Sequence, residues 1–511
     1  LIIFALAAYA AAHTLGFLPK SLSPKALVLA LLTVYKAFHR FQLRMRGITE
    51  DDVAYRRVVT GQSWEEFCDT LKAAGTAVIG HNSPKDPLNQ AEGYRYLARL
   101  TRVALENFLE CADPLSPQLV ALANGNRQCR VCIGSDNPDN LYQNAVIDSR
   151  RTYRVRGSRG TVNYLGFGVQ SGSYGAPGGL RTVDYKEASE LKMQPHAKGK
   201  DAGSSPSSSL SSSSSSSSSS PTIEIYIVPE GEHPPPGIPT TNILRSRPQL
   251  SEEGLFIVRQ TFARRSKELP AELSIEVVSP KGDTASSPPR ASPSLSPSNR
   301  ARERKVPAAE KEADSGLVPI RKFTPKALDA GLSKAGLLVA GASNMFSRWA
   351  SGFKSNHVNK LPLFDQKTSD SVGGDPNIRY YHSYWEIGED EALVIDAKPP
   401  KCQTWNFQLN NHWMESLDYR FHNIHTNKFL ARYRKDGSVR VIVSHRRPQG
   451  SSSSSRSPSS GDLEEGFNWL STVGHHCGTM CWRWVKPEVP DAALPHPTAK
   501  LVRFSQLAVM E

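Results

Sequence analysis

The run Thr404-Trp405-Asn406-Phe407-Gln408-Leu409-Asn410-Asn411-His412-Trp413-Met414-Glu415-Ser416-Leu417-Asp418-Tyr419 crowds aromatic, amide and histidine side chains together. Its start alternates polar and large apolar residues, which predicts a β-strand at 404–409 that enters a turn and carries its amides on one face. Such residues suit a pocket for a polar ligand, a sugar or hydroxylated metabolite. The alternative is an amide ladder within a sheet. The candidate ligand-binding residues here are Trp405, Asn406, Gln408, Asn410, Trp413 and Tyr419.

A second run, Asn468-Trp469-Leu470-Ser471-Thr472-Val473-Gly474-His475, continues to Trp482-Arg483-Trp484. His475 is the candidate catalytic acid or base, and Arg483 the candidate anion holder. A general base needs an orienting partner within hydrogen-bond reach, and a histidine bonded to backbone is the structural alternative. No Gly-x-Ser-x-Gly elbow, Walker loop or dinucleotide fingerprint occurs. Partners available to His475 in neighbouring runs are His412, His445 and Asp418.

Short β-rich runs extend outward from these two on both sides. No regular alternation of strand and helix accompanies them, so the pattern favours a β-sandwich over an α/β fold. The predicted fold is α+β, with a β-sandwich-like antiparallel core, N-terminal helices, an inserted helical segment and an N-terminal transmembrane helix. Strands are predicted at 142–147, 152–156, 161–169, 222–228, 255–262, 273–278, 380–387, 392–396, 404–409, 429–433, 439–444, 481–485 and 500–507.

Helices are indicated by capping signals and by apolar residues at helical spacing. Ser63-Trp64-Glu65-Glu66 is a capping-box start, and a second amphipathic stretch runs from 87 to 112. Thr324-Pro325 supplies an N-cap followed by proline at the first helical position, which opens a helix to about residue 353.

The chain of 511 residues is too long for one ordinary domain, but serine-rich tracts lack the apolar content to fold. Seven scattered cysteines suggest reduced thiols. The predicted layout is a membrane anchor with a basic arm (1–47), a helical part (50–112), a first β-rich half (125–277) with a serine-rich insertion (187–221), a disordered linker (278–315), a helical segment (316–358) and a C-terminal β-rich domain (375–508) with a disordered insertion (448–465).

The N-terminus is apolar, because residues 1–18 contain no charged side chain. That length is at the lower limit for a membrane-spanning helix, and a cleaved signal peptide is the alternative. Six Lys and Arg residues follow between 20 and 46 with no acid among them. They supply nearly half of the net charge of the chain, which is +13. Positive flanks stay cytosolic, so the sequence predicts a single-pass protein with its soluble part on the cytosolic side and residues 1–46 contacting lipid. No nucleic-acid-binding motif accompanies the charge.

Two further clusters have competing interpretations. Asp136-Asn137-Pro138-Asp139-Asn140 gathers oxygen ligands for a hard cation, or caps a strand as an Asx-turn, because the spacing of a calcium loop is missing. Cys129 and Cys132 suggest zinc only if they join His475, His476, Cys477 and Cys481, and this second half lacks standard zinc-knuckle spacing. We therefore predict no metal site, and we add Asp136, Asn137 and Asp139 to the candidate ligand-binding residues.

A resemblance rests on the runs 135–142, 151–157, 405–419 and 468–484. Together they resemble the uncharacterised, mainly bacterial family catalogued as domain of unknown function 1214, over about residues 50–185 and 375–508. The resemblance implies a β-rich fold and no established activity or cofactor. The serine-rich insertions and the apolar N-terminus depart from the compact pattern of that family.

Two functions are compatible with the sequence. The first is a membrane-anchored binding module whose C-terminal β-rich domain holds a small polar ligand or a partner, as the lack of a complete catalytic motif favours. The second is an enzyme, of hydrolase or isomerase type, with His475 as general acid or base. The runs 135–142 and 151–157 belong to the same resemblance as the C-terminal runs. We therefore expect the C-terminal residues to form only half of the site.

Overall fold

The computed structural model describes residues 42, 45–80, 83–123, 131–173, 180–193, 222–278, 323–371, 374–448 and 467–509. The chain forms two compact units, Leu1–Glu66 with Phe323–Ala330, and Phe67–Lys322 with Gly331–Glu511. The predicted apolar N-terminal helix, most of each serine-rich insertion and nearly all of the predicted linker lie outside the described residues. Within the described ranges, no helix is both long enough and apolar enough to cross a bilayer.

The first unit contains helix α3 (Glu50–Val59), which begins at a capping box. The Thr49 hydroxyl accepts from the Asp52 N–H at 3.1 Å, and the Asp52 carboxylate accepts from the Thr49 N–H at 2.9 Å. Arg57 follows one turn later and pairs with both Glu66 (2.8 Å) and Asp329 (2.9 Å). These bonds hold three separate stretches of this unit together.

Three longer helices extend into or lie in the second unit. Asp86 caps α5 (Pro87–Leu105) through the Asn89 N–H at 3.0 Å. Thr324 caps α6 (Pro325–Asn356) through the Ala327 N–H at 3.1 Å, which confirms the predicted Thr324-Pro325 start. The predicted capping role of Ser63 is wrong, because this residue lies inside its helix and its hydroxyl donates to Asp329 at 2.6 Å. The helices are α4 (Gln62–Ile79), α5 (Pro87–Leu105) with a π-helical turn at Glu106–Glu110, α6 (Pro325–Asn356) and the short α7 (Gln366–Ser371).

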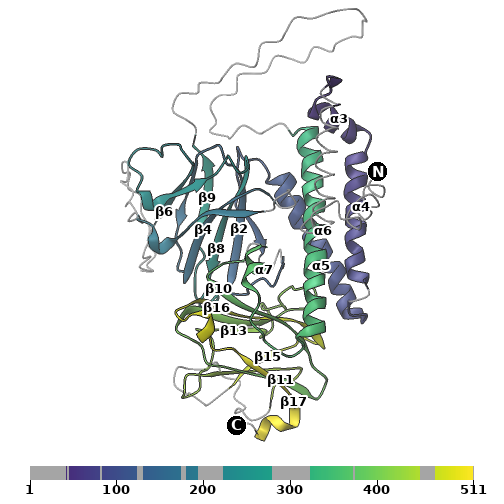
Figure 1. The fold of residues 1–511 in the computed structure, drawn as a ribbon, viewed down its shortest axis with the longest axis vertical. Helices are drawn as coiled ribbons and strands as arrows, with labels where there is room; N and C mark the ends of the chain where they lie inside the picture. The colour runs from purple at the N-terminus through teal and green to yellow at the C-terminus, as the bar shows by residue number, and fades with distance from the viewer. Residues whose placement is uncertain are drawn as a thin grey trace, which may run out of the picture. The chain divides into compact units, whose positions relative to one another are not determined.

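The second unit contains four sheets in two facing pairs, drawn in blue to teal and in green to yellow (Figure 1). One sheet of the first pair has the order β1 (Val120–Ala123), β2 (Asn140–Asp148), β8 (Glu253–Thr261), β4 (Tyr164–Ser171), β5 (Arg181–Glu187). The other has the order β7 (Ile243–Ser246), β6 (Thr222–Pro229), β3 (Tyr153–Ser158), β9 (Glu272–Val277). Apolar residues of both sheets form one core, in which Phe167 stacks on Phe256 and Val155 and Ile225 are fully buried.

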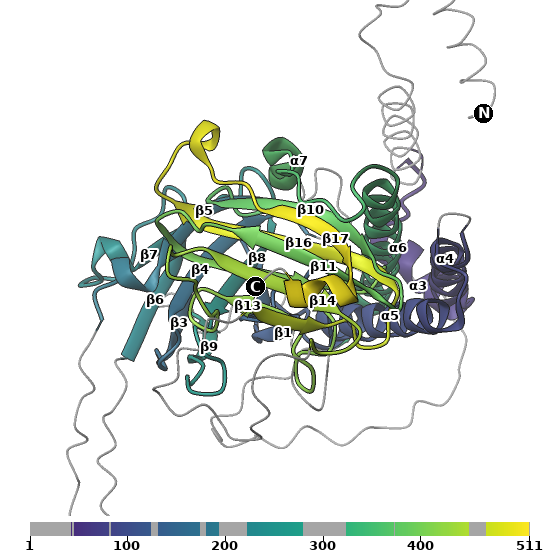
Figure 2. The same cartoon turned by 90° about the horizontal axis from the view of Figure 1, so that it is seen from below.

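The second pair of sheets repeats this arrangement (Figure 2). One sheet has the order β10 (Ile378–Glu386), β16 (Cys477–Pro487), β12 (Cys402–Leu409), β13 (His425–Asn427). The other has the order β15 (Asn468–Ser471), β14 (Val439–Ser444), β11 (Glu391–Ala397), β17 (Thr498–Arg503). Their common core contains Trp405 stacked on Trp482, with ring centroids 5.1 Å apart, and the fully buried Leu393 and Val441. The α+β architecture with several antiparallel sheets is thus confirmed.

Two details of the predicted sheets are wrong. The pairs β6 with β7 and β14 with β15 are parallel, so neither sandwich is purely antiparallel. The strand predicted at 429–433 is absent: the chain there forms a turn followed by irregular backbone, and the nearby strand β13 ends at Asn427. The Asn427 side-chain oxygen accepts from the N–H groups of Phe429 (2.9 Å) and Leu430 (3.0 Å), which satisfies backbone donors locally and ends the pairing.

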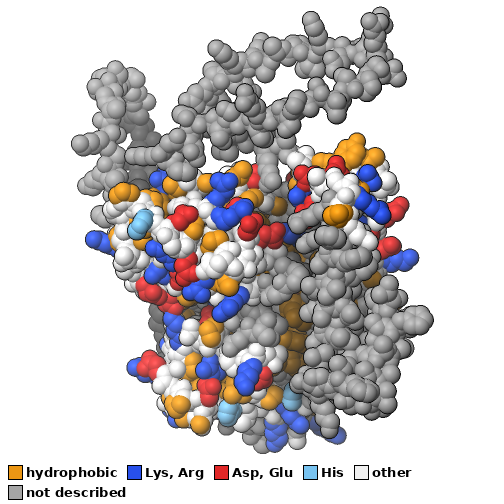
Figure 3. Space-filling view, turned by 45° about the horizontal axis from the view of Figure 1, so that its top comes forward, with side chains coloured by type: hydrophobic (Ala, Val, Ile, Leu, Met, Phe, Trp, Pro, Cys, Tyr) orange, Lys and Arg blue, Asp and Glu red, His pale blue; other side chains and the backbone are white. Residues whose placement is uncertain are grey.

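Charged side chains of both signs are interspersed on the surface of the first sandwich (Figure 3). Arg150 pairs with Asp148 at 2.9 Å in the turn after β2, and Arg154 on β3 pairs with Glu276 on β9. These arginines therefore have acidic neighbours in the folded chain.

Candidate functional site

The loop before β2 reaches into the second sandwich. The Asp136 carboxylate accepts from the Ser416 N–H (3.0 Å) and from the Ser416 hydroxyl (2.8 Å), and the Asn137 side-chain oxygen accepts from the Asp139 N–H at 2.9 Å. The bond from the Asp139 N–H to the Asn137 side chain forms an Asx-turn just before strand β2. No group of three or more potential metal ligands from His, Cys, Asp and Glu occurs among the described residues.

Backbone strain is concentrated where this loop meets the turn after β12. Ser135 and Met414 both have φ of 58°, in the left-handed region that non-glycine residues rarely adopt, and the Ser135 N–H donates to the Met414 carbonyl at 2.7 Å. Each such residue costs on the order of 1–3 kcal/mol and persists only where its surroundings hold it. The junction between loop and sheet is therefore tightly specified.

The amides Asn406 and Gln408 of β12 and Asn410 just after it form a ladder on one face, which was the alternative to a ligand pocket. Asn406 Nδ2 donates to Gln408 Oε1 (3.3 Å), and Gln408 Nε2 donates to Asn410 Oδ1 (2.7 Å). The ladder also holds the loop, because Gln408 Nε2 donates to the Asp136 carbonyl at 2.8 Å and Asn410 Nδ2 donates to the Ser135 hydroxyl at 2.8 Å. Gln408 and Asn410 are fully buried, so the ladder is a structural joint.

Arg483 on β16 completes this joint. Its Nη1 donates to Gln408 Oε1 at 2.6 Å, and its Nη2 donates to the Ser135 carbonyl. The side chain is 5% exposed, and the guanidinium lies 5.6 Å from the centre of the Tyr380 ring. The sequence led us to expect that Arg483 holds an anionic ligand. In the structure, two of its guanidinium nitrogens donate to oxygen atoms of the protein itself.

His475 lies in a separate charged network under helix α5. Its Nδ1 donates to the Thr472 carbonyl (3.0 Å), and its Nε2 contacts Glu92 Oε2 at 2.7 Å. Burial opposes the charged imidazole, but the hydrogen bond and charge of Glu92 outweigh burial and raise the pKa of His475. Since oxygens face both ring nitrogens, the imidazolium form satisfies both contacts.

The same network continues through Asn411. Its Nδ2 donates both to Glu92 Oε2 (3.0 Å) and to Glu415 Oε2 (2.9 Å), and Arg99 on α5 donates to Glu415 Oε1 at 2.6 Å. Burial acts against the ionised Glu92, but its hydrogen bonds to His475 and Asn411 and the charges nearby lower its pKa. The network therefore ties α5 to the second sandwich through ionised groups, and His475 takes part as a structural residue bonded to backbone.

The aromatic residues expected to stack on a ligand lie in the core or at its margin. Trp413 packs against Gly93 of α5, where its Nε1 donates to the Asn89 carbonyl at 2.8 Å. The Trp405 indole belongs to the core of the second sandwich, and Tyr419 lies beside Arg265. Asp136, Asn410, Trp413 and His475 therefore do not converge on the cavity described next.

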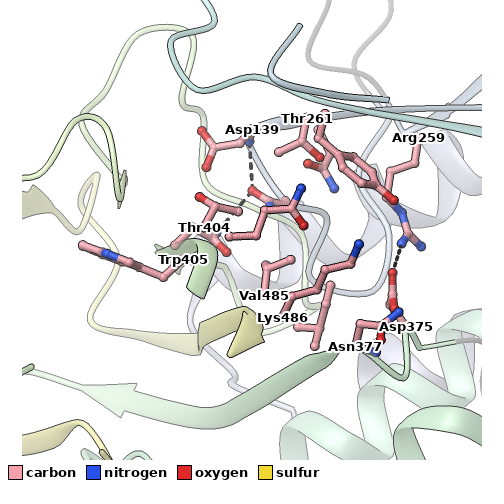
Figure 4. A pocket seen from close by; sticks show the side chains of 15 residues that line it. Asp139, Arg259, Thr261, Asp375, Asn377, Thr404, Trp405, Val485 and Lys486 are labelled. Atoms are coloured by element: carbon pink, nitrogen blue, oxygen red, sulfur yellow. Dashed lines mark hydrogen bonds and ion pairs between the residues drawn. The ribbon is translucent and has the colours of Figure 1, made fainter. Parts of the chain in front are cut away.

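A partly open pocket lies between the two sandwiches, with about 40 Å³ in its interior. Figure 4 shows Arg259, Asp375 and Lys486 on one side of it, and the Trp405 ring pointing away from it. Arg259 Nη1 pairs with Asp375 Oδ2 at 2.6 Å. The predicted residues that line the pocket are Asn137, Asp139, Trp405 and Asn406; sequence reasoning missed Asn140, Tyr164, Arg259, Thr261, Asp375, Asn377, Ile378, Gln403, Thr404, Val485 and Lys486.

Four buried polar atoms of this lining have no hydrogen-bond partner in the described part of the chain. They are Asn140 Oδ1, Arg259 Nε, Gln403 Oε1 and Asn406 Oδ1. An unpaired buried polar atom costs about 1–3 kcal/mol, so four of them among the residues of one lining make this cavity a candidate site. Asn140 ends the acidic and amide cluster 136–140, and Gln403 directly precedes the run 404–419, so both lie next to residues that the sequence pointed to. Nothing in the sequence around Arg259 indicated a site.

The cysteines of the suggested zinc site lie apart. Cys129 is outside the described residues, and Cys132 lies beside Ser416 at 3.6 Å. Cys477 accepts from the Tyr384 hydroxyl at 3.2 Å, whereas Cys481 lies 4.0 Å from His382. Among the described residues they do not assemble into one ligand set.

Comparison with known proteins finds solved structures that resemble this chain. No protein-family model matches the chain, and no curated protein does. A crystal structure of an uncharacterised protein from Burkholderia cenocepacia is 37% identical, with a TM-score of 0.66, and the match covers 88% of this chain and 99% of that one. A protein from Vibrio parahaemolyticus matches at 11% identity over 84% of this chain and 100% of its own, with a TM-score of 0.37, too low to show a common fold. By its identity and coverage, the chain belongs to the family of the uncharacterised Burkholderia cenocepacia protein.

Proposed function

We propose that the chain is a binding module that holds a small polar molecule in the pocket between its two β-sandwiches. One observation carries the proposal: a single cavity is lined by polar side chains of both sandwiches, four of which (Asn140, Arg259, Gln403 and Asn406) have a buried polar atom without a partner in the described part of the chain. Ligand sites combine a concave surface with a few convergent polar groups, and this pocket has both.

The proposal favours binding over catalysis. His475, the expected acid or base, does not line the pocket, and both of its ring nitrogens have partners. Asp139 Oδ1 already accepts from Asn427 Nδ2 (2.9 Å) and lies 3.2 Å from His425 Nε2, and Asp375 is paired with Arg259. We keep from the sequence the expectations of an N-terminal membrane anchor and of membership in the family of domain of unknown function 1214.

The test is ligand-observed NMR on the full chain with four classes of small compound: polyols, carboxylates, phosphates and amines. The variant Thr404→Tyr places a ring at the lining of the pocket, and Thr498→Tyr on the exposed strand β17 is its control. We expect at least one class to bind saturably to the natural chain and to Thr498→Tyr, and to lose binding in Thr404→Tyr. If no class binds, or if every binder is indifferent to Thr404→Tyr, the proposal is wrong.

A further inference from the structure

Large apolar side chains are exposed along helix α3 in the first unit. Tyr55 and Val59 lie one turn apart on this helix and are 59% and 66% exposed. Trp64, at the start of α4, is 58% exposed, and its N–H donates to the Gly61 carbonyl at 3.0 Å in the short link from α3. The three side chains therefore belong to one short stretch around a single helix-to-helix link.

The first unit has more exposed apolar side chains than its size predicts. Its described part consists mainly of two short stretches, 45–66 and 323–330, and the second unit contains most of the described chain. Exposed apolar groups that gather in so small a region mark an interaction surface, whereas single ones scattered over a protein do not. The large exposed apolar residues of this unit are Met45, Tyr55, Val59, Trp64 and Phe323.

Three acids next to these side chains are balanced by cations of the same unit. Lys326 Nζ lies 2.9 Å from Asp51 and 3.7 Å from Glu50, both in the first turn of α3. Arg57 pairs with Glu66 at 2.8 Å. These carboxylates therefore do not leave an unbalanced negative charge beside the apolar surface.

The sequence that leads into this unit indicates which partner covers the surface. Residues 1–18 contain no charged side chain, and six Lys and Arg residues with no acid among them follow between 20 and 46. An apolar stretch followed by a basic arm is typical of a chain that enters a membrane and continues along anionic headgroups. The arm ends at Arg46, just before α3, so an anchor of this kind places α3 at the lipid surface.

The exposed residue types fit the same partner. Tyr and Trp favour the boundary between water and acyl chains, because each has an apolar ring and a polar group. We propose that Tyr55, Val59 and Trp64 enter the headgroup region of a lipid bilayer and hold α3 against its surface. This contact adds a second attachment to the one expected for residues 1–46, and it is independent of the pocket.

The test is quenching of tryptophan fluorescence in the full chain. It uses vesicles of phosphatidylcholine and phosphatidylserine whose acyl chains carry bromine near the carbonyl end, because bromine quenches an indole that contacts it. We expect part of the emission to be quenched, and the quenched part to be lost in Trp64→Phe and retained in Trp469→Phe, the control on β15. Absence of quenching in the natural chain, or quenching that persists in Trp64→Phe, overturns the proposal.

A matched pair of variants tests the surface around Trp64. Val59→Asp and Ile79→Asp each replace an apolar side chain that is more than half exposed, but Ile79 ends α4 in the second unit. We expect Val59→Asp to lower the quenching about twofold, because anionic headgroups repel the added carboxylate, and Ile79→Asp to leave it unchanged. Equal quenching in the two variants contradicts the proposal.

Sedimentation of the natural chain without lipid tests the competing occupant, a second copy of this chain. A dimer that Val59→Asp converts to a monomer would show that the surface binds this copy in place of lipid. None of these outcomes affects the ligand titrations that test the pocket.

Discussion

Glu92→Gln is the substitution that tests the buried charge network most directly. It keeps the shape of the side chain and removes its negative charge. Glu92 accepts from His475 (2.7 Å), Asn411 (3.0 Å) and Arg95 (2.8 Å), so three contacts change at once. An amide keeps only one acceptor oxygen for these partners, and it cannot stabilise the imidazolium of His475 by its charge.

The size of the effect follows from which of these bonds are buried. Hydrogen bonds to charged groups contribute about 1.5–3 kcal/mol, whereas neutral ones contribute about 0.5–1.5 kcal/mol. The hydrogen bond between Glu92 and His475 is buried, so the substitution should remove most of the extra stabilisation that its charge provides. Arg95 is half exposed, so the loss of its contact should change the stability little. We expect the free energy of unfolding to fall by about 1–2 kcal/mol, which in a unit of this size lowers Tm by about 2 °C.

The pH dependence provides the sharper test. The pKa of His475 is raised from its usual 6.5, so its contribution to stability is complete below that value and is lost as pH rises through the folded-state pKa. The pKa of Glu92 is lowered from 4.5, so its contribution is present above that value and is lost as pH falls through the folded-state pKa. The pair therefore stabilises most between about pH 4.5 and pH 6.5, and the deficit of Glu92→Gln should be largest there and shrink toward alkaline pH.

The assay is thermal unfolding followed by tryptophan fluorescence at about pH 5.5 and about pH 9. Glu252→Gln is the control, because Glu252 is 67% exposed in its pairing with Arg150 and should change Tm by less than about 1 °C. If Glu92→Gln is no worse than Glu252→Gln at the lower pH, or if its deficit grows toward pH 9, the ion-pair account of this network is refuted.

Two further predictions concern packing and thiol access. Gly93→Ala should lower the free energy of unfolding by about 1–3 kcal/mol, because the added methyl would lie 2.7 Å from the Trp413 ring; calorimetry checks this, and a neutral result would mean that the helix shifts freely. An alkylating reagent near neutral pH, followed by peptide mass spectrometry, should label the exposed Cys68 and spare Cys481, where burial raises the thiol pKa to about 11; equal labelling of both would contradict the burial of Cys481.

The pattern of β12 shows what the sequence could predict. Trp405, Phe407 and Leu409 alternate with Asn406 and Gln408, and a strand with two distinct faces follows from that period alone. The apolar set is buried in the sandwich core and the amide set binds the loop before β2. Pattern therefore predicted the strand and its faces, together with the amide ladder as one of two interpretations.

The pocket could not be predicted in the same way. Arg259 lies near the end of β8 and Lys486 near the end of β16, in runs whose pattern indicates only a strand. Arg259 and Lys486 come close together only because of how the two sandwiches pack. The periodicity of the sequence around either residue does not predict that packing. The same holds for Glu92, which reads as an ordinary polar position of an amphipathic helix until His475 is placed against it.

The bonds between the loop at 135–139 and the second sandwich bear on how such a chain can be inherited. Partners such as Asn406 with Asn137 and Ser416 with Asp136 are 269 and 280 positions apart. A gene rearrangement that replaced either β-rich half alone would leave buried amides and a carboxylate without partners, at about 1–3 kcal/mol each. The two halves should therefore recombine as one hereditary unit.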